Sequence, residues 1–286
     1  MSATAASTVN KAVSTRVAYG HALCELGETN PNVVVVDADL TTCTMTCYFA
    51  ERFPERFFNG GIAESNMVGV GAGLATTGKT VFVNSFAMFS AGRAYDQVRN
   101  SVCYPKLNVK VVGTHAGLSV GEDGATHQCI EDISLMRTIP GMTVIVPADA
   151  EEARRATFAM AEYEGPCYLR LGRSPVPTVT ADVPGYEFEL GKAAVLRGVV
   201  GEAADVTIVA CGLMVGRALD AAAALAEEGV NARVLDMHTI KPIDREAVLA
   251  AARETGAIVT AEECLQKYGL TVDHVKEAAR EAIARK

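Results

Sequence analysis

Two histidines and two carboxylates lie within 13 positions, residues 115–127, of the segment VVGTHAGLSVGEDGATHQCIED, residues 111–132. They are His115, Glu122, Asp123 and His127. The segment begins in an apolar run, and loops that follow the carboxyl ends of parallel strands are where α/β proteins place ligand sites. Each histidine alone is more often a satisfied polar residue than a catalytic one. Together the four residues favour a site for a polar small molecule.

A further carboxylate, Glu64, lies in the glycine-rich segment GIAESNMVGVGAGLATTG, residues 61–78. The glycines lack the spacing G-x-G-x-x-G, and no strand is expected before them, so a dinucleotide-binding turn is excluded. The pattern predicts a helix with small residues on one face and Glu64 in its first turn. On its own, a carboxylate at such a position usually compensates the helix dipole.

Aromatic and basic residues follow two other predicted strands. Phe86 and Phe89 are spaced to line either a pocket for a flat ring or a hydrophobic core, and the residues alone favour the core. Arg170 and Arg173 lie at a strand end, where a guanidinium can pair with phosphate or carboxylate. The plainer interpretation is a pair of solvated arginines.

The elements that position these residues are indicated by short β-branched runs with helical patterns between them. Because the runs are apolar throughout, they predict an α/β fold with parallel strands covered by helices on both faces. Helices are expected over 9–26 and from Asp149, which supplies a cap. The expected strands are 33–37, 80–83, 109–114, 143–146 and 167–171.

A segment rich in proline divides the chain into two predicted domains. Residues 174–186 are expected to form a linker between domains at 1–173 and 187–286. In the second domain, helices are expected over 215–228 and 245–254, the latter capped by Asp244. The expected strands there are 193–197, 205–210, 232–236 and 257–260.

Composition excludes several classes of protein. The 286 residues carry 34 acidic and 26 basic side chains, a formal charge of −8 that argues against sequence-independent nucleic-acid binding. No apolar run is long enough for a membrane span and no signal peptide is apparent, so we expect a cytoplasmic protein. The eight cysteines are expected to be free thiols. Cys43 and Cys47 lack a second pair with zinc-ligand spacing, so small buried hydrophobes are favoured over a metal site.

The order of several motifs resembles the pyrimidine-binding and C-terminal domains of transketolase over nearly the whole chain, and in particular the C-terminal subunit of a split transketolase. The resemblance implies a thiamine diphosphate-binding pyrimidine-type fold followed by a transketolase C-terminal-like fold. The residues that carry it are Asp37-Ala-Asp39-Leu40, Gly61-Ile-Ala-Glu64-Ser-Asn-Met, Phe86-x-x-Phe89, Thr114-His115, Gly121-Glu-Asp123-Gly-Ala-Thr-His127-Gln128 and Gly172-Arg173.

The resemblance implies thiamine diphosphate as cofactor and a catalytic role for Glu64. A carboxyl group bonded to the ring nitrogen of the aminopyrimidine drives it to the imino tautomer, which removes the C2 proton. The apolar Ile62, Met67 and Val68 are expected to raise the pKa of Glu64 by desolvation. By the same resemblance, Phe86 and Phe89 are walls that stack on the pyrimidine. Asp39 and Leu40 match positions beside the cofactor.

Further matches imply transfer of a two-carbon ketol unit from a ketose, expected to be phosphorylated, to an aldose. His115 and Asp123 match positions that contact the hydroxyls of the donor, and His127 matches one near the reacting carbons. Arg16 and Arg173 match positions that bind the distal phosphate. Two departures leave the substrate open: the third aromatic of the family's pocket falls near Gly92, and Cys43 replaces a phosphate-contacting serine.

The family's Gly-Asp-Gly motif, which with a later Asn binds the diphosphate through Mg²⁺, is absent from the sequence. We therefore expect no metal ligands in this chain, a partner N-terminal subunit that carries the motif and binds Mg²⁺, and a heterotetramer. The alternatives are a β-type subunit of a 2-oxoacid dehydrogenase, a deoxyxylulose phosphate synthase-like protein, or a regulatory or scaffold paralogue of the same fold.

The C-terminus departs from the family layout. Thr260-Ala-Glu-Glu263 is followed directly by Cys264-Leu-Gln-Lys-Tyr-Gly-Leu-Thr271, whereas the family places about 35–40 further residues between them, the length of an α/β unit. A true deletion would expose an apolar sheet edge. We expect instead that the sequence joins two ordered parts across a missing stretch at 263/264.

Overall fold

The computed structural model describes residues 12–181, 183–263 and 271–285. Its strands are β1 Val13–Ser14, β2 Val33–Asp37, β3 Phe57–Asn59, β4 Thr80–Phe86, β5 Val109–Thr114, β6 Thr143–Ile145, β7 Cys167–Arg170, β8 Pro175–Val176, β9 Ala194–Arg197, β10 Val206–Ala210, β11 Ala232–Asp236, β12 Thr239–Lys241 and β13 Ile258–Ala261. Its α-helices are α1 Thr15–Thr29, α2 Thr41–Thr44, α3 Cys47–Arg52, α4 Glu64–Ala75, α5 Tyr95–Gln97, α6 Asp132–Thr138, α7 Ala150–Glu162, α8 Met214–Glu227, α9 Arg245–Thr255 and α10 Val272–Ala284. Two π-helical segments, Met88–Arg93 and Val98–Cys103, flank α5.

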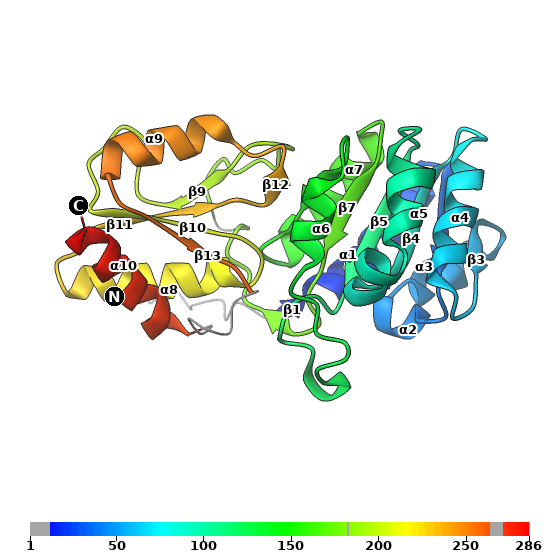
Figure 1. Cartoon of the computed structure of the whole chain (residues 1–286), viewed down its shortest axis with the longest axis horizontal. Helices are drawn as coiled ribbons and strands as arrows, with labels where there is room; N and C mark the ends of the chain where they lie inside the picture. Colours follow the sequence, from blue (N-terminus) through cyan, green and yellow to red (C-terminus); the bar gives the residue numbers. More distant parts are fainter. Residues whose placement is uncertain (1–11, 182, 264–270, 286) are drawn as a thin grey trace, which may run out of the picture.

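These elements form two α/β domains that lie side by side (Figure 1). The first contains a seven-stranded sheet in the order β12-β6-β7-β5-β4-β2-β3, and the second a four-stranded sheet in the order β13-β10-β11-β9. Neighbouring strands are parallel except for the pairs β12–β6 and β9–β11. The structure thus confirms the expected fold class of two mostly parallel sheets flanked by helices.

Both faces of the first sheet are buried, as its continuous apolar strands predict. Val81 and Val83 of β4 pack in one cluster with Met67 of α4, while Phe82 between them packs with Tyr19 of α1 on the opposite face. Burial of each such side chain contributes roughly 1.5–3 kcal/mol. The second domain has a separate core, in which α8 and α10 pack on the strands.

The start of the chain and the predicted linker differ from expectation because they pair with each other. Val13–Ser14 form β1, antiparallel to Pro175–Val176 of β8, so the first described helix begins at Thr15 and not near residue 9. The linker is therefore tied to the N-terminal segment. The expected break between Glu263 and Cys264 lies outside the described residues and stays a prediction.

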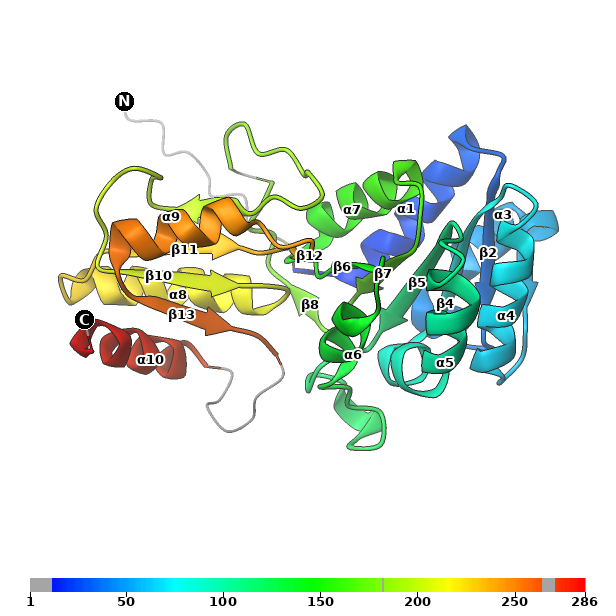
Figure 2. The ribbon, with the colours of Figure 1, turned by 45° about the horizontal axis from the view of Figure 1, so that its top comes forward.

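Besides β1 and β8, two further short strands were not predicted. The expectation that no strand precedes Gly61 is wrong, because β3 pairs with β2 at the sheet edge, although the glycine spacing still excludes a dinucleotide-binding turn. β12 extends from the second domain to pair with β6 of the first (Figure 2). The first sheet thus includes one strand from beyond the predicted linker.

A pair of buried carboxyl groups joins the two domains. Glu152 of α7 accepts hydrogen bonds from the Ala148 N–H at 2.6 Å and from the Tyr186 hydroxyl. Neither oxygen of Asp236, at the end of β11, accepts from an N–H or hydroxyl group of the described chain, and the Glu152 carboxyl lies within hydrogen-bonding reach of it. Burial is the main cause that raises the pKa of Glu152 to about 7 and the pKa of Asp236 well above its usual range. The neighbouring Glu152 carboxyl raises the pKa of Asp236 further. Two such groups can bond only when one holds a proton.

This pair predicts that stability falls as pH rises. The folded chain retains a proton that the unfolded chain loses near pH 4.5, so the free energy of unfolding should decrease as pH rises toward the folded pKa of about 7. Asp236→Asn supplies an amide donor with no proton to titrate and should flatten this decrease. Urea unfolding between about pH 5 and 8 measures it, with the exposed Asp220→Asn as control. An unchanged slope in Asp236→Asn would contradict the shared proton.

Candidate functional site

The topology brings the predicted site residues to one edge of the first sheet, the edge formed by the carboxyl ends of its parallel strands. Because β2, β3, β4, β5 and β7 are parallel, their carboxyl ends meet at this edge. The segments that leave these ends carry Asp39 and Leu40, Glu64, Phe86 and Phe89, His115, and Arg173 in turn. Ligand sites of parallel α/β sheets form at such edges.

Four rings form the centre of this edge. Phe86 is the last residue of β4, and its ring centroid lies 4.0 Å from that of His115 and 6.0 Å from that of Phe89. His127 meets Phe89 edge-on at 5.4 Å. A stacked aromatic contact needs about 4.5 Å, so a third ring does not fit between the two phenylalanines. They form one aromatic surface; Phe86 is only 4% exposed, so the half-buried Phe89 is the part of this surface that a flat ring can reach.

His115 is neutral at physiological pH. It has a backbone φ of +56°, is buried, and its Nδ1 lies 3.0 Å from the Thr114 hydroxyl. Burial, followed by the positive charge of Arg16, lowers the pKa of His115 to about 4. A neutral imidazole can donate a hydrogen bond to a hydroxyl group or accept one from it, and it places no charge beside that group.

Two arginines lie next to each other beside His115. Arg16 donates to the carbonyl of Cys43 at 2.6 Å and to the carbonyl of Arg173 at 3.5 Å. Arg173 binds Glu122 at 2.7 Å and lies 3.9 Å from Asp123. Burial first, and then the charge of Arg173 among other neighbours, lower the pKa of Arg16. An anionic ligand would relieve the repulsion between two such cations.

Glu64 is the first residue of α4 and is only 2% exposed. Its Oε2 accepts from Arg93 Nη1 at 2.8 Å, and the guanidinium of Arg93 lies 4.4 Å from the Phe89 ring centroid. Met67 is buried as expected, but Ile62 is 79% exposed and cannot desolvate the carboxylate within this chain. Arg93 was not among the predicted site residues; its one signal in the sequence was its place next to Gly92, where the family has an aromatic.

Asp37 shapes the loop that carries Asp39 and Leu40. Its buried carboxylate accepts from the Leu40 N–H at 2.6 Å and from the hydroxyls of Thr44 and Thr46 at 2.7 and 2.9 Å. Asp39, at φ +64°, accepts from Asn59 at the end of β3. This contact links the loop after β2 to the turn before Glu64.

The described residues fit the ring half of a cofactor site. An aromatic surface near a buried carboxylate suits a flat heterocycle with a ring nitrogen. Across the described ranges, no group of three or more histidine, cysteine or acidic side chains is arranged to hold a metal ion. The cysteines characterised in the structure, Cys43 and Cys47 among them, are free. None of the described helices is both long and apolar enough to cross a bilayer.

Fold and site together define a two-domain α/β protein in which aromatic, acidic and basic side chains lie together at the carboxyl ends of a parallel sheet. Residues 11–178 match the family model of the transketolase pyrimidine binding domain. Residues 191–285 match that of the transketolase C-terminal domain. The chain belongs to the transketolase family.

Similar proteins include separate transketolase subunits. A 6-deoxy-6-sulfo-D-fructose transketolase subunit from Clostridium sp. is 46% identical over 89% of this chain and 77% of its own. An apulose-4-phosphate transketolase subunit from Phocaeicola vulgatus is 40% identical over 91% of this chain and 82% of its own. A solved structure described as a split gene transketolase, inactive β4 tetramer, is 48% identical with a TM-score of 0.85, covering 96% of this chain and 99% of that one.

Proposed function

We propose that this chain is the pyrimidine-side subunit of a two-chain, thiamine diphosphate-dependent transketolase. It transfers a two-carbon ketol unit from a phosphorylated ketose to an aldose. The observation that supports this most is the buried Glu64 next to the aromatic surface of Phe86 and Phe89, on the same sheet edge as His115 and Arg173. The similarity to named transketolase subunits agrees with it.

Each residue then has a chemical role. Thiamine diphosphate, when bound, would supply the nucleophile for the ketose carbonyl. Glu64 holds a proton at the pyrimidine ring nitrogen, while the phenylalanine surface orients the ring. Asp39 and Leu40 line the same cofactor.

The substrate is bound by the loop between β5 and α6 and by two arginines. Neutral His115 and the carboxylate of Asp123 hydrogen-bond donor hydroxyls, and His127 lies beside the reacting carbons. Arg16 and Arg173 bind the distal phosphate through charge-assisted hydrogen bonds.

The proposal requires a partner. An N-terminal subunit with Gly-Asp-Gly would bind Mg²⁺ and the diphosphate, in a heterotetramer that we place in the cytoplasm. The test is to mix the purified chain with such a subunit, thiamine diphosphate, Mg²⁺, a ketose phosphate and an aldose. Ketol transfer should need both chains. Decarboxylation of 2-oxoacids instead would favour the dehydrogenase alternative, and a mixture without thiamine chemistry would favour the scaffold alternative.

Arg173→Ala should weaken the binding of phosphorylated substrates selectively. A guanidinium–phosphate pair contributes roughly 1.5–3 kcal/mol, so KM for a ketose phosphate should rise about tenfold or more. The kcat with a short donor that lacks phosphate should barely change. Steady-state kinetics on both donors measures this, with Arg154→Ala, whose partner Glu25 lies outside the site, as control. Equal losses on both donors would assign Arg173 a structural role.

A further inference from the structure

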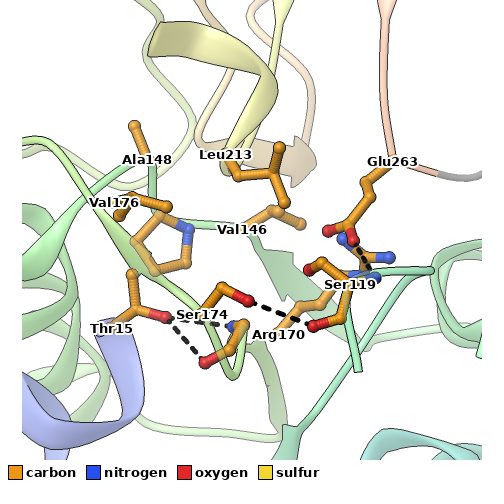
Figure 3. A pocket seen from close by; sticks show the side chains of 12 residues that line it. Thr15, Ser119, Val146, Ala148, Arg170, Ser174, Val176, Leu213 and Glu263 are labelled. Atoms are coloured by element: carbon orange, nitrogen blue, oxygen red, sulfur yellow. Dashed lines mark hydrogen bonds between the residues drawn. The ribbon is translucent and has the colours of Figure 1, made fainter. Parts of the chain in front are cut away.

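A carboxylate of the second domain binds a loop of the first domain, residues 115–131 between β5 and α6, which we call the substrate loop. Glu263 follows β13, and its side chain is 3% exposed. Its Oε1 accepts from the Leu118 N–H at 3.0 Å and from the Ser119 N–H at 2.7 Å. Figure 3 shows the side chain directed from the end of the strand toward Ser119. Hydrogen bonds to a charged acceptor are about twice as strong as neutral ones.

These two amides lie at the neck of the loop between β5 and α6. Gly117 and Cys129 pair across the neck with backbone hydrogen bonds of 2.8 and 3.2 Å. Gln128 Nε2 adds a hydrogen bond to the Leu118 carbonyl at 3.1 Å. His115 lies two residues before Gly117, and His127 lies two residues before Cys129, so the positions of both histidines depend on the conformation of the neck.

Gly117 makes the contact possible. It has φ +79°, and a Cβ placed there would lie 2.3 Å from Cδ of Glu263. No other residue type allows the carboxylate to approach the backbone so closely. The Glu263 carboxylate therefore packs directly against the backbone of the loop at Gly117.

The contact is enclosed by both domains. Ser119 and Glu263 border a cavity of about 20 Å³, room for roughly one water molecule, that Leu213 closes from the second domain. The Ser174 hydroxyl donates to the Ser119 carbonyl at 3.2 Å from the other side. With Glu263 removed, the two amides would lose a fixed, charged acceptor, and the neck would be held less firmly.

We infer that Glu263 is a positioning residue, through which the C-terminal domain holds the substrate loop in its binding conformation. The inference rests on the proposed function, because the loop matters for activity only if His115, Asp123 and His127 bind the donor. All predicted site residues belong to the first domain. Glu263 therefore gives the second domain a part in substrate binding without contact to substrate.

The test compares Glu263→Ala and Glu263→Gln with Glu246→Ala, an exposed carboxylate of α9 in the same domain, in the two-chain complex. Amide hydrogen exchange of the peptide covering residues 115–129 should speed up about tenfold or more at Leu118 and Ser119 in Glu263→Ala. Glu263→Gln keeps the volume and a carbonyl acceptor without the charge, and should lie between Glu263→Ala and wild type. Glu246→Ala should match wild type.

Kinetics completes the test. KM for the ketose donor should rise about fivefold or more in Glu263→Ala, and by a larger factor than kcat falls, because Glu64 and the phenylalanine surface are untouched while the loop residues that bind the donor are less well held. Wild-type exchange in both Glu263 variants would overturn the inference, as would faster exchange with unchanged KM. If Glu263→Ala does not fold, Glu263→Gln decides by the same two readouts. A wild-type complex without ketol transfer would refute the proposed function, while the exchange data would still show whether Glu263 holds the loop.

Discussion

Glu64→Gln should reduce kcat of the assembled enzyme at least about a hundredfold, the scale of a lost acid–base group. Glutamine keeps the shape of the side chain at the start of α4 and an oxygen that accepts from Arg93, so folding should be unaffected. It cannot hold and release a proton at the pyrimidine nitrogen. Exchange of the cofactor's C2 proton with deuterated solvent, followed by NMR, should therefore slow in parallel with turnover.

Glu55→Gln is the matched control, since this glutamate is exposed and pairs only with its neighbour Arg56 among the described ion pairs. Circular dichroism should show the same fold for both variants. The result that would refute the role is C2 exchange at the wild-type rate in Glu64→Gln. Glu64 would then be only a charge that compensates the helix dipole, the interpretation that the residue alone favoured.

The structure adds a condition to this role. Glu64 is ion-paired with Arg93, and Arg93 also covers the Phe89 ring. A pyrimidine ring on the aromatic surface would compete with Arg93 for both contacts. Arg93 must therefore leave Glu64, or share it with the pyrimidine ring, when the complete site forms. The expectation of purely apolar surroundings for Glu64, based on Met67 and Val68, did not include this ion pair.

The positions of the site residues could be predicted because they depend on strands with strong local signals. The apolar runs of β2, β4 and β5 are found where expected, and parallel pairing brings whatever follows them to one edge. β3 and β12 have three residues each, too few for a periodic pattern, and exist because a longer strand offers them backbone partners.

Arg93 and Glu263 were missed for a related reason. Arg93 meets Glu64 across 29 positions of sequence, and Glu263 meets Leu118 across 145. Apart from Gly92 beside Arg93, nothing in the local sequence of either residue distinguishes it from a surface charge. Only the packing of helix, loop and second domain gives them a role, so their contacts follow from tertiary structure and not from a motif.

The purified chain without a partner should bind thiamine diphosphate too weakly to detect at micromolar concentrations. It offers an aromatic surface, worth about 0.5–1.5 kcal/mol in a ring contact, and one charged hydrogen-bonding group, worth about 1.5–3 kcal/mol. Their sum, about 2–4.5 kcal/mol, corresponds to a Kd near or above about 1 mM. The sequence lacks the Gly-Asp-Gly motif that would add the affinity of a diphosphate–Mg²⁺ contact, and the described residues hold no cluster of three or more histidine, cysteine or acidic side chains for a metal ion.

Isothermal titration of the single chain with cofactor and Mg²⁺ tests this expectation, and the same titration of the mixture with a Gly-Asp-Gly subunit is the positive control. Saturable heat should appear only in the mixture. The Glu64→Gln mixture separates the two halves of the site: since the metal and diphosphate contacts remain, it should still bind the cofactor, with at most the loss of one hydrogen-bonding group. Micromolar binding by the single chain would mean that it contains a complete cofactor site, and the two-subunit proposal would then be wrong.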